Sequence, residues 1–278
     1  MVLEPGQDGV KAVPPVVAGI DLGSLCTKAV LIDSEGKVVS YSIIRSGAIY
    51  QGAAEKSFGE ALTNAGLKAS DVQYIVATGY GRNRVPFANE QITEISCHAR
   101  GAKWTFPEIH TIVDIGGQDS KVIYVGDQGQ VMNFVMNDKC AAGTGRFLEV
   151  MAVALEVYLD QLGTLSLQST KDVEVSSMCT VFAESEVISL IASGTEKADI
   201  AASIHRAIAR RVSGMVGQLG LREKVSMSGG VAKNIGVVRA LEKKLRTTLL
   251  LAPEPQIIGA LGAALVAADR SGILAVKA

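Results

Sequence analysis

The sequence lacks an excess of charge of either sign and lacks any long run of basic residues. Its 27 lysines and arginines are balanced by 28 aspartates and glutamates, which leaves a net charge of −1 over 278 residues. A protein that follows a nucleic-acid backbone or a membrane surface needs clustered lysine and arginine. We therefore expect neither nucleic acid nor a membrane as a partner.

Long hydrophobic runs and a leader sequence are also missing. The most apolar stretch near the C-terminus, 257–268, is too short and too rich in glycine to span a bilayer. Residues 1–15 contain acids, glycines and prolines without the basic-then-apolar pattern of a signal peptide, so we expect a flexible tail. Apolar residues make up 48% of the chain, which suits a compact cytoplasmic α/β protein of two domains.

Cysteine and histidine are scarce, and their spacing excludes the common metal motifs. The cysteines at 26, 97, 140 and 179 form no CxxC pair, and the 3 histidines have no metal-ligand spacing. A zinc ribbon or a thioredoxin-type site is therefore not expected. The GxxxxGK[ST] loop of P-loop proteins is absent as well. For Cys26 and Cys97 the expectation is a buried free thiol.

What the sequence does contain is one pattern that occurs twice, at a gap-free offset of 93 residues. The segment DLGSLCTK at 21–28 is matched by DIGGQDSK at 114–121. Each copy predicts a strand, a glycine-bearing turn around an aspartate, and a hairpin that turns at 33–36 or 126–129. Two such loops that face each other can hold a polyphosphate from both sides. A nucleotide-binding cleft is therefore predicted.

The rest of the chain is predicted to alternate strands and helices. A strand is expected at 72–78, and helical spacing occurs at 52–65, 91–103, 145–155, 180–192, 200–219 and 253–268. Strands followed by helices, in two related halves, indicate two α/β domains. We expect a first domain from 16–100 plus 256–278 and a second domain from 101–255, which would carry Cys140 and Cys179.

The two loops and a later Gly-Gly turn supply the groups that a nucleotide needs. Backbone N–H groups in glycine-rich turns can approach phosphate, and Asp21 and Asp114 are placed to hold hydrated magnesium. Lys28 or Lys121 can supply positive charge. Side chains that can donate to phosphate are Ser24, Thr27, Gln118 and Ser120. The turn at 229–230, before a helix, is a further phosphate or adenosine contact.

The predicted nucleotide site combines residues from both halves of the chain. It comprises Asp21, Gly23, Ser24, Leu25, Cys26, Thr27, Lys28, Asp114, Gly116, Gly117, Gln118, Lys121, Gly143, Thr144, Gly145, Gly229, Gly230, Val231, Asn234, Gln256 and Gly259. The pattern resembles the superfamily of acetate and sugar kinases, heat-shock chaperone ATPases and actin. That resemblance implies two RNase H-like domains with ATP in the cleft between them and a hinge motion between ATP and ADP states.

Two cysteines stand at predicted helix starts. Cys140 comes just before a helix whose expected cap is Thr144, and Cys179 opens the helix at 180–192. A thiol at a helix N-terminus favours the thiolate. Two thiolates per chain are half the ligands of a 4Fe–4S cluster, and a twofold dimer supplies the other half. On spacing alone the alternative stays open that both are ordinary small residues beside a nucleotide loop.

Six segments closely resemble the ATP-dependent activators of 2-hydroxyacyl-CoA dehydratases, the family of the benzoyl-CoA reductase ATPase subunits. They are ATGYGRN at 77–83, TEISCHARGA at 93–102, DIGGQDSKVI at 114–123, NDKCAAGTGRFLEVMA at 137–152, CTVFAESEVISL at 179–190 and SGGVAKN at 228–234. The resemblance covers about residues 17–268. It implies a homodimer that holds one 4Fe–4S cluster through Cys140 and Cys179 of each subunit.

The resemblance also implies what such a dimer does. An ATPase with bound Mg²⁺ and ATP or ADP would pass low-potential single electrons to a partner dehydratase-type enzyme in anaerobic metabolism. The electrons would come from ferredoxin or flavodoxin. ATP binding is expected to rotate the helices that begin near Cys140 and Cys179. By analogy, Gln118, Asp119 and Glu184 are candidates for positioning the attacking water.

Two other functions fit the same motifs. A reductase of a double-cubane iron–sulfur protein would carry identical segments. A small-molecule kinase of the same superfamily would share the nucleotide loops, but it would require an acceptor pocket and no iron. Iron and sulfide analysis after anaerobic purification separates the kinase from the electron-transfer proteins.

Overall fold

Two five-stranded sheets with flanking helices make up the protein. A computed structural model describes residues 15–47, 50–176 and 179–274, so the expected tail at 1–15 lies almost wholly outside the described residues. The strands of the first sheet are β1 (Val16–Leu22), β2 (Cys26–Ile32), β3 (Val38–Arg45), β4 (Val72–Thr78) and β5 (Glu90–Gln91). Those of the second are β6 (Thr111–Ile115), β7 (Ser120–Val125), β8 (Val131–Asn137), β9 (Val225–Ser228) and β10 (Leu249–Leu251).

The two sheets repeat one topology. Their strand orders are β3-β2-β1-β4-β5 and, read from the matching edge, β8-β7-β6-β9-β10. In each sheet the first three strands pair antiparallel, while the remaining pairs are parallel. The irregularity between residues 31 and 32 of β2 recurs between residues 124 and 125 of β7. The repeat that is visible in the sequence is therefore a repeat of whole sheets.

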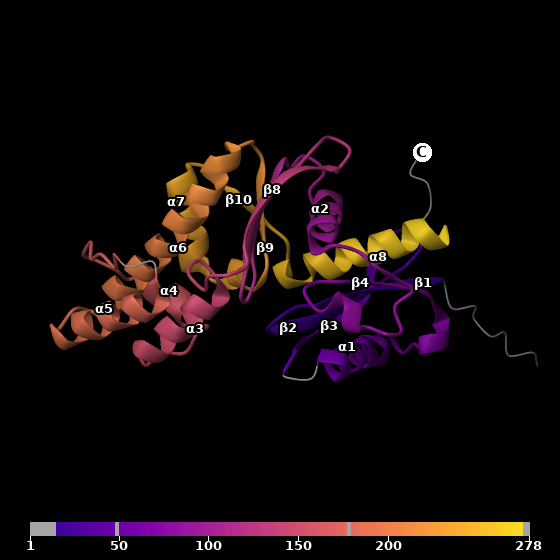
Figure 1. The fold of residues 1–278 in the computed structure, drawn as a ribbon, viewed down its shortest axis with the longest axis horizontal. Helices are drawn as coiled ribbons and strands as arrows, with labels where there is room; N and C mark the ends of the chain where they lie inside the picture. The colour runs from indigo at the N-terminus through magenta and orange to yellow at the C-terminus, as the bar shows by residue number, and fades with distance from the viewer. Residues whose placement is uncertain (1–14, 48–49, 177–178, 275–278) are drawn as a thin grey trace, which may run out of the picture.

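Eight helices flank the sheets within the described residues, together with short 3-10 turns. They are α1 (Tyr50–Ala65), α2 (Glu94–Thr105), α3 (Gly145–Ala154), α4 (Leu162–Ser166), α5 (Thr180–Ala192), α6 (Lys197–Leu219), α7 (Ile235–Leu245) and α8 (Ile258–Ser271). The 3-10 turns are Ala69–Asp71, Arg82–Arg84, Gly230–Lys233 and Pro255–Ile257. Figure 1 shows α1 and α8 with the first sheet, α3 to α7 with the second, and α2 beside both. No helix in these ranges is long and apolar enough to span a bilayer.

Two predicted helix starts are corrected by local hydrogen bonding. The helix expected from residue 91 begins at Glu94, because Gln91 pairs with β4 and the Thr93 side chain accepts from the Ser96 amide. The helix expected from residue 253 begins at Ile258, after the 3-10 turn at Pro255–Ile257. The predicted helix at 180–192 has its expected bounds.

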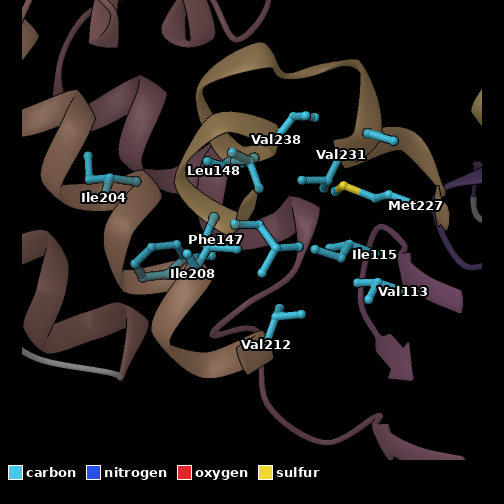
Figure 2. Close-up of a cluster of buried hydrophobic side chains, with 14 of the residues drawn as sticks. Val113, Ile115, Phe147, Leu148, Ile204, Ile208, Val212, Met227, Val231 and Val238 are labelled. Carbon is cyan, nitrogen blue, oxygen red and sulfur yellow. The ribbon is translucent and has the colours of Figure 1, made fainter. Parts of the chain in front are cut away.

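The core beside the second sheet fixes α3 against β6. Figure 2 shows Val113 and Ile115 of β6 in one apolar cluster with Phe147 of α3, Ile208 of α6 and Met227 of β9. Each of these side chains is at most 2% exposed. Burying large apolar side chains contributes about 1.5–3 kcal/mol each. This packing holds the beginning of α3 next to the loop that follows β6.

Helix α2 joins the two sheets. Ala99 of α2 packs with Ile112 and Ile123 of the second sheet. On another side α2 crosses α8 in backbone contact, because a Cβ atom added at Gly262 would lie 1.7 Å from the carbonyl oxygen of Cys97. Since α8 also packs on β1, β2 and β4, a shift of α2 changes how both sheets are placed.

Candidate functional site

A cleft of about 560 Å³ is lined by residues of both sequence repeats. That volume is in the range of small-molecule sites. The two loops face each other closely, since a Cβ atom at Gly117 would lie 2.5 Å from a methyl group of Leu25. Of the residues predicted from the sequence, the lining contains Asp21, Gly23, Ser24, Leu25, Cys26, Lys28, Asp114, Gly116, Gly117, Asp119, Lys121, Gly145, Gly229, Gly230, Val231, Asn234 and Gln256.

Each repeat brings one buried aspartate and one lysine to the cleft. Asp21 is opposite Lys28 in the β1–β2 register, and Asp114 is opposite Lys121 in the β6–β7 register. The lysine Nζ donates to the aspartate Oδ2 at 2.9 Å in the first repeat and 3.2 Å in the second. Both pairs lie where β1 and β6 end, so two carboxylates and two ammonium groups meet at the cleft.

Lys121 is surrounded by three carboxylates. Its Nζ lies 3.2 Å from Asp114, 2.7 Å from Asp119 and 3.5 Å from Glu94. Burial alone would lower the pKa of Lys121, but the carboxylates outweigh it and raise that pKa above its usual value. Burial raises the pKa of Glu94, an effect that Lys121 partly opposes. Lys121 is therefore a permanent cation in the cleft.

Asp114 has two further partners that the sequence did not reveal. The Nε2 atom of His98 lies 3.2 Å from its Oδ1, and the Ser228 hydroxyl donates to the same oxygen at 2.7 Å. Burial raises the pKa of Asp114, but His98 and Lys121 bring it well below the usual value. Asp114 is therefore an ionised carboxylate that is held from β7, β9 and α2.

Both ring nitrogens of His98 face oxygen acceptors. Nδ1 lies 2.9 Å from the carbonyl oxygen of Glu94, which can only accept, and Nε2 faces the Asp114 carboxylate. Each nitrogen therefore carries a proton. Burial would lower the pKa of His98, but the Asp114 charge outweighs it and raises the pKa to about 9.

The Gly-Gly turn after β9 completes the far wall of the cleft. Gly229 has φ of 86°, and a Cβ atom there would lie 2.2 Å from the carbonyl oxygen of Ile115. Only glycine fits such a conformation and approach without strain. The turn leads into the 3-10 turn at Gly230–Lys233, and Asn234 then caps α7 by accepting from the Val237 amide at 3.1 Å.

Two predicted phosphate donors face away from the cleft. Thr27 and Ser120 are equivalent residues of the repeat, and both are buried. The Thr27 hydroxyl pairs with that of Ser46 at 2.9 Å, and Ser120 donates to the Met215 sulfur at 3.7 Å. Alternate residues of a strand face opposite sides, so the cleft receives Lys28 and its sheet neighbours instead. This corrects the expectation that these hydroxyls reach phosphate.

Other predicted residues also fall outside the cleft lining. Gln118 is exposed on the loop, and Gly143 lies against the Arg211 side chain. Thr144 occupies the expected cap position of α3, but its hydroxyl donates to the Ala141 carbonyl at 2.7 Å rather than capping the helix.

The remaining two predicted residues that are absent from the lining belong to α8 and α5. Gly259 packs against the ring of His98, where a Cβ atom would lie 2.7 Å from Cε1. Glu184 lies on α5 and is half-buried.

The two exposed cysteines precede two helices that pack against each other. Cys140 lies in the loop before α3, where the Asn137 side chain donates to its carbonyl at 2.9 Å. Cys179 is the N-cap residue of α5, and α3 packs against α5. Cys97 is buried, and burial raises its pKa to about 12, whereas Cys26 is half-buried in the cleft.

Within the described ranges no group of three or more His, Cys, Asp or Glu side chains gathers as a metal site. Two exposed thiols at the starts of two packed helices nevertheless match half of the donor set of a 4Fe–4S cluster.

The first turn of α3, which follows the loop that carries Cys140, is bonded directly to the second phosphate loop. The amide of Gly145 donates to the carbonyl oxygen of Gly116 at 2.9 Å, and the amide of Arg146 donates to that of Gly117 at 2.8 Å. These are the first residues of α3, a few positions after Cys140. A displacement of the phosphate loop therefore moves the start of this helix.

Glu94 and His98 line the cleft and Ser228 bonds to Asp114, and sequence reasoning assigned none of the three to the site. A signal for the first two was present, because residues four apart on a helix share a face. Glu94 and His98 have this spacing on a helix that was expected to cross between the domains. For Ser228 the position at the end of β9, directly before the Gly-Gly turn, was such a signal.

Comparison with known proteins shows the family of this chain. The family model described as BadF/BadG/BcrA/BcrD ATPase matches residues 18–267. The (R)-2-hydroxyglutaryl-CoA dehydratase activating ATPase of Acidaminococcus fermentans is 50% identical over 250 residues, which cover 90% of this chain and 95% of that protein. The 2-hydroxyisocaproyl-CoA dehydratase activator of Clostridioides difficile is 46% identical over 256 residues, 91% of this chain and 95% of that one.

Solved structures agree with the sequence relatives. Component A of the A. fermentans (R)-2-hydroxyglutaryl-CoA dehydratase superposes with a TM-score of 0.90 at 48% identity, over 92% of this chain and 99% of that chain. The Clostridium difficile activator with bound ADPNP gives a TM-score of 0.89 at 44% identity, over 92% and 96% of the two chains. A ROK family glucokinase from Streptomyces griseus, at 14% identity and a TM-score of 0.56 over 91% and 99%, shares the fold. The predicted kinase-like α/β fold is confirmed.

Proposed function

We propose that this protein, which belongs to the BadF/BadG/BcrA/BcrD ATPase family, uses ATP hydrolysis to deliver single electrons to a 2-hydroxyacyl-CoA dehydratase-type enzyme. The names of relatives at 46% and 50% identity, over nine-tenths of this chain, support the partner class. The chemistry of the cleft and of the two exposed thiols supports the mechanism.

The cleft would hold ATP or ADP with Mg²⁺. The paired loops offer backbone amides to the phosphates, while Lys28 and Lys121 neutralise part of the phosphate charge. Asp21 and Asp114 would orient the hydrated ion, which retains most of its waters. A related structure at 44% identity contains ADPNP, which supports nucleotide in this cleft.

Asp119 and Gln118 are the proposed positioning residues for the attacking water. Asp119 lines the cleft, and its carboxylate lies 2.7 Å from Lys121 Nζ, beside the second phosphate loop. Gln118 is its exposed neighbour on the same loop. The third candidate, Glu184, lies on α5 and, like Gln118, outside the lining of the cleft.

Cys140 and Cys179 would hold one 4Fe–4S cluster together with the same two residues of a second copy. Their exposure and their helix-start positions fit thiolate ligands that must meet a partner subunit. When bound, such a cluster supplies one-electron chemistry at low potential. Ser176 also donates its amide to the Glu186 carboxylate of α5 at 2.7 Å.

The bonds from Gly145 and Arg146 to the second phosphate loop are the observation that carries the proposal. A γ-phosphate that draws Gly116 and Gly117 toward it also pulls the amino end of α3, which follows the Cys140 loop. ATP binding and hydrolysis can thereby change the surroundings of Cys140 without a mobile linker.

The remaining parts of the proposal concern context. Reduced ferredoxin or flavodoxin would be the electron donor, and the cytoplasm would be the location, since both ATP and such carriers are available there.

The proposed domains are 16–100 plus 256–278 and 101–255. The packing of α8 on β1, β2 and β4 supports assigning the C-terminal helix to the first domain.

An activation assay tests the proposed function. The anaerobically purified protein, reduced with dithionite, is mixed with (R)-2-hydroxyglutaryl-CoA dehydratase, with and without ATP. We expect ATP-dependent dehydration of the acyl-CoA. ATP-dependent reduction of a double-cubane protein without any dehydratase activation would favour that alternative. Phosphorylation of a sugar by an iron-free protein would contradict the proposal.

A further inference from the structure

We propose that His98 is a positioning residue for ATP hydrolysis, which holds the Asp114 carboxylate in place from helix α2. Its Nε2 atom lies 3.2 Å from Asp114 Oδ1, and its Nδ1 atom lies 2.9 Å from the carbonyl oxygen of Glu94. The ring is thus fixed at both ends, by its own helix and by the end of β6.

The bonds around Asp114 leave its carboxylate one orientation. Oδ1 accepts from His98 and from the Ser228 hydroxyl at 2.7 Å, while Oδ2 accepts from Lys121 at 3.2 Å. With both oxygens engaged, rotation of the carboxylate would break at least one of these bonds. A site held this way is pre-organised for turnover.

The two halves of the repeat differ at this point. Asp21, the counterpart of Asp114, has Lys28 as its ion-pair partner within the described residues. Asp114 has the equivalent lysine and, in addition, a histidine from α2. The extra contact therefore distinguishes the second loop, whose glycines are bonded to α3.

The ring of His98 is also confined by α8. His98 is 7% exposed, and Gly259 at the start of α8 leaves room for it, because a Cβ atom there would lie 2.7 Å from Cε1. The elements α2, α8 and β6 meet at this ring. A change in the relative position of the two sheets would therefore move His98 and, through it, the Asp114 carboxylate. We expect this contact to matter for turnover more than for nucleotide affinity.

Steady-state ATP hydrolysis by the anaerobically purified protein tests the proposal. His98→Ala removes the donor to Asp114, and His98→Gln keeps an amide N–H that can reach it. We expect His98→Ala to lower kcat about tenfold or more, with KM within about threefold, because misplacement of a catalytic group by 1 Å can cost two orders of magnitude. His98→Gln should recover most of the lost kcat.

A matched control is available in His110. Its Nδ1 lies 2.9 Å from the Glu223 carbonyl and its Nε2 lies 3.1 Å from Asp127 Oδ1, so it repeats the bonding of His98 at a half-buried site outside the cleft lining. His110→Ala should leave kcat and KM unchanged. Iron content, measured in every variant, should stay constant, so this test stands apart from that of the cluster.

Gly259→Ala provides an independent route, because the added methyl group displaces the ring without changing its chemistry. We expect a lower kcat there too. The proposal is overturned if His98→Ala keeps kcat within about twofold of the unmodified protein. It is equally overturned if the Ala and Gln variants lose kcat to the same extent in step with their melting temperatures.

Discussion

The amide of Arg146 donates a hydrogen bond of 2.8 Å to the carbonyl oxygen of Gly117. Gly117 belongs to a loop that lines the nucleotide cleft, and Arg146 belongs to the first turn of α3. Because the segment that carries Cys140 runs straight into this turn, the nucleotide and the exposed thiols are separated by a short run of backbone. The proposed coupling can therefore change the surroundings of Cys140 without a large rearrangement of the protein.

Asp114→Asn should reduce ATP turnover and leave bound iron unchanged. The substitution removes a buried carboxylate that balances Lys121 and His98 and that is proposed to orient the ion. We expect kcat to fall by about two orders of magnitude, the usual cost of losing a pre-organised electrostatic group. Coupled-enzyme ATPase kinetics and iron analysis measure both quantities. Asp127→Asn is the control, since Asp127 is exposed and pairs with a histidine outside the cleft lining. Loss of iron in the Asp114 variant would show that the two sites are not separate.

Cys140→Ala and Cys179→Ala should each abolish the visible absorbance of the purified protein. Each change would remove two of the four proposed thiolates of a dimer, while the residues that line the cleft stay unaltered. ADP affinity, measured by calorimetry, should therefore remain within about threefold of the unmodified protein. Cys26→Ala is the matched control, because its thiol lies in the cleft, and it should keep the colour. A coloured Cys140→Ala or Cys179→Ala protein would refute the ligand assignment.

Gly262→Ala should destabilise the protein, whereas Gly59→Ala should stabilise it. A Cβ atom at Gly262 would lie 1.7 Å from the Cys97 carbonyl oxygen, so α2 and α8 must move apart. Overpacking of this kind costs about 1–3 kcal/mol. Gly59 is exposed on α1, where an added methyl group would have nothing within 4 Å, and a helical Gly→Ala change gains about 0.5–1 kcal/mol. Urea unfolding midpoints that shift in the same direction for both variants would contradict the described helix crossing.

Stability should decline in acid because of His205. Burial, with a smaller effect of Arg206, lowers the pKa of His205 to about 3, and neither ring nitrogen has a hydrogen-bond partner among the described residues. Between the ordinary pKa of 6.5 and about 3, the unfolded chain binds a proton that the folded chain excludes. The contribution of His205 to the free energy of unfolding is therefore fully present above pH 6.5. It falls as the pH is lowered, by up to about 1.4 kcal/mol per pH unit.

His205→Leu isolates this contribution. The stability of the variant relative to the unmodified protein should rise as the pH is lowered from 7.5 to 5. The lower limit is about one and a half units below the ordinary histidine pKa. Urea unfolding at several pH values measures that difference. A difference that does not change with pH would mean that His205 binds its proton as readily in the folded protein as in the unfolded chain.

The sequence predicted the sheets better than it predicted the side chains of the site. The repeat located β1, β2 and β3 together with β6, β7 and β8, because a strand, turn and hairpin are encoded locally. It also located Asp21 and Asp114, which stand at strand ends. What it could not supply was the orientation of α2 relative to β6, which depends on packing between segments that are distant along the chain. His98 was therefore missed.

The error at Thr27 and Ser120 has a different cause. Strand alternation was visible in the sequence, and the choice of Lys28 for the cleft face already implied that Thr27 faces the opposite side. The exposed position of Gln118 and the distance of Glu184 from the lining depend instead on loop geometry and on helix packing. No local pattern encodes either of these.

The most direct test of the central claim is to measure mass, iron and sulfide on one chromatographic peak of the anaerobically purified protein. We expect a dimer of two 29.1 kDa chains that contains about four iron and four sulfide ions. A coloured peak at the mass of one chain, or a dimer without iron that still activates a dehydratase, would contradict the proposal that Cys140 and Cys179 of two subunits share one cluster.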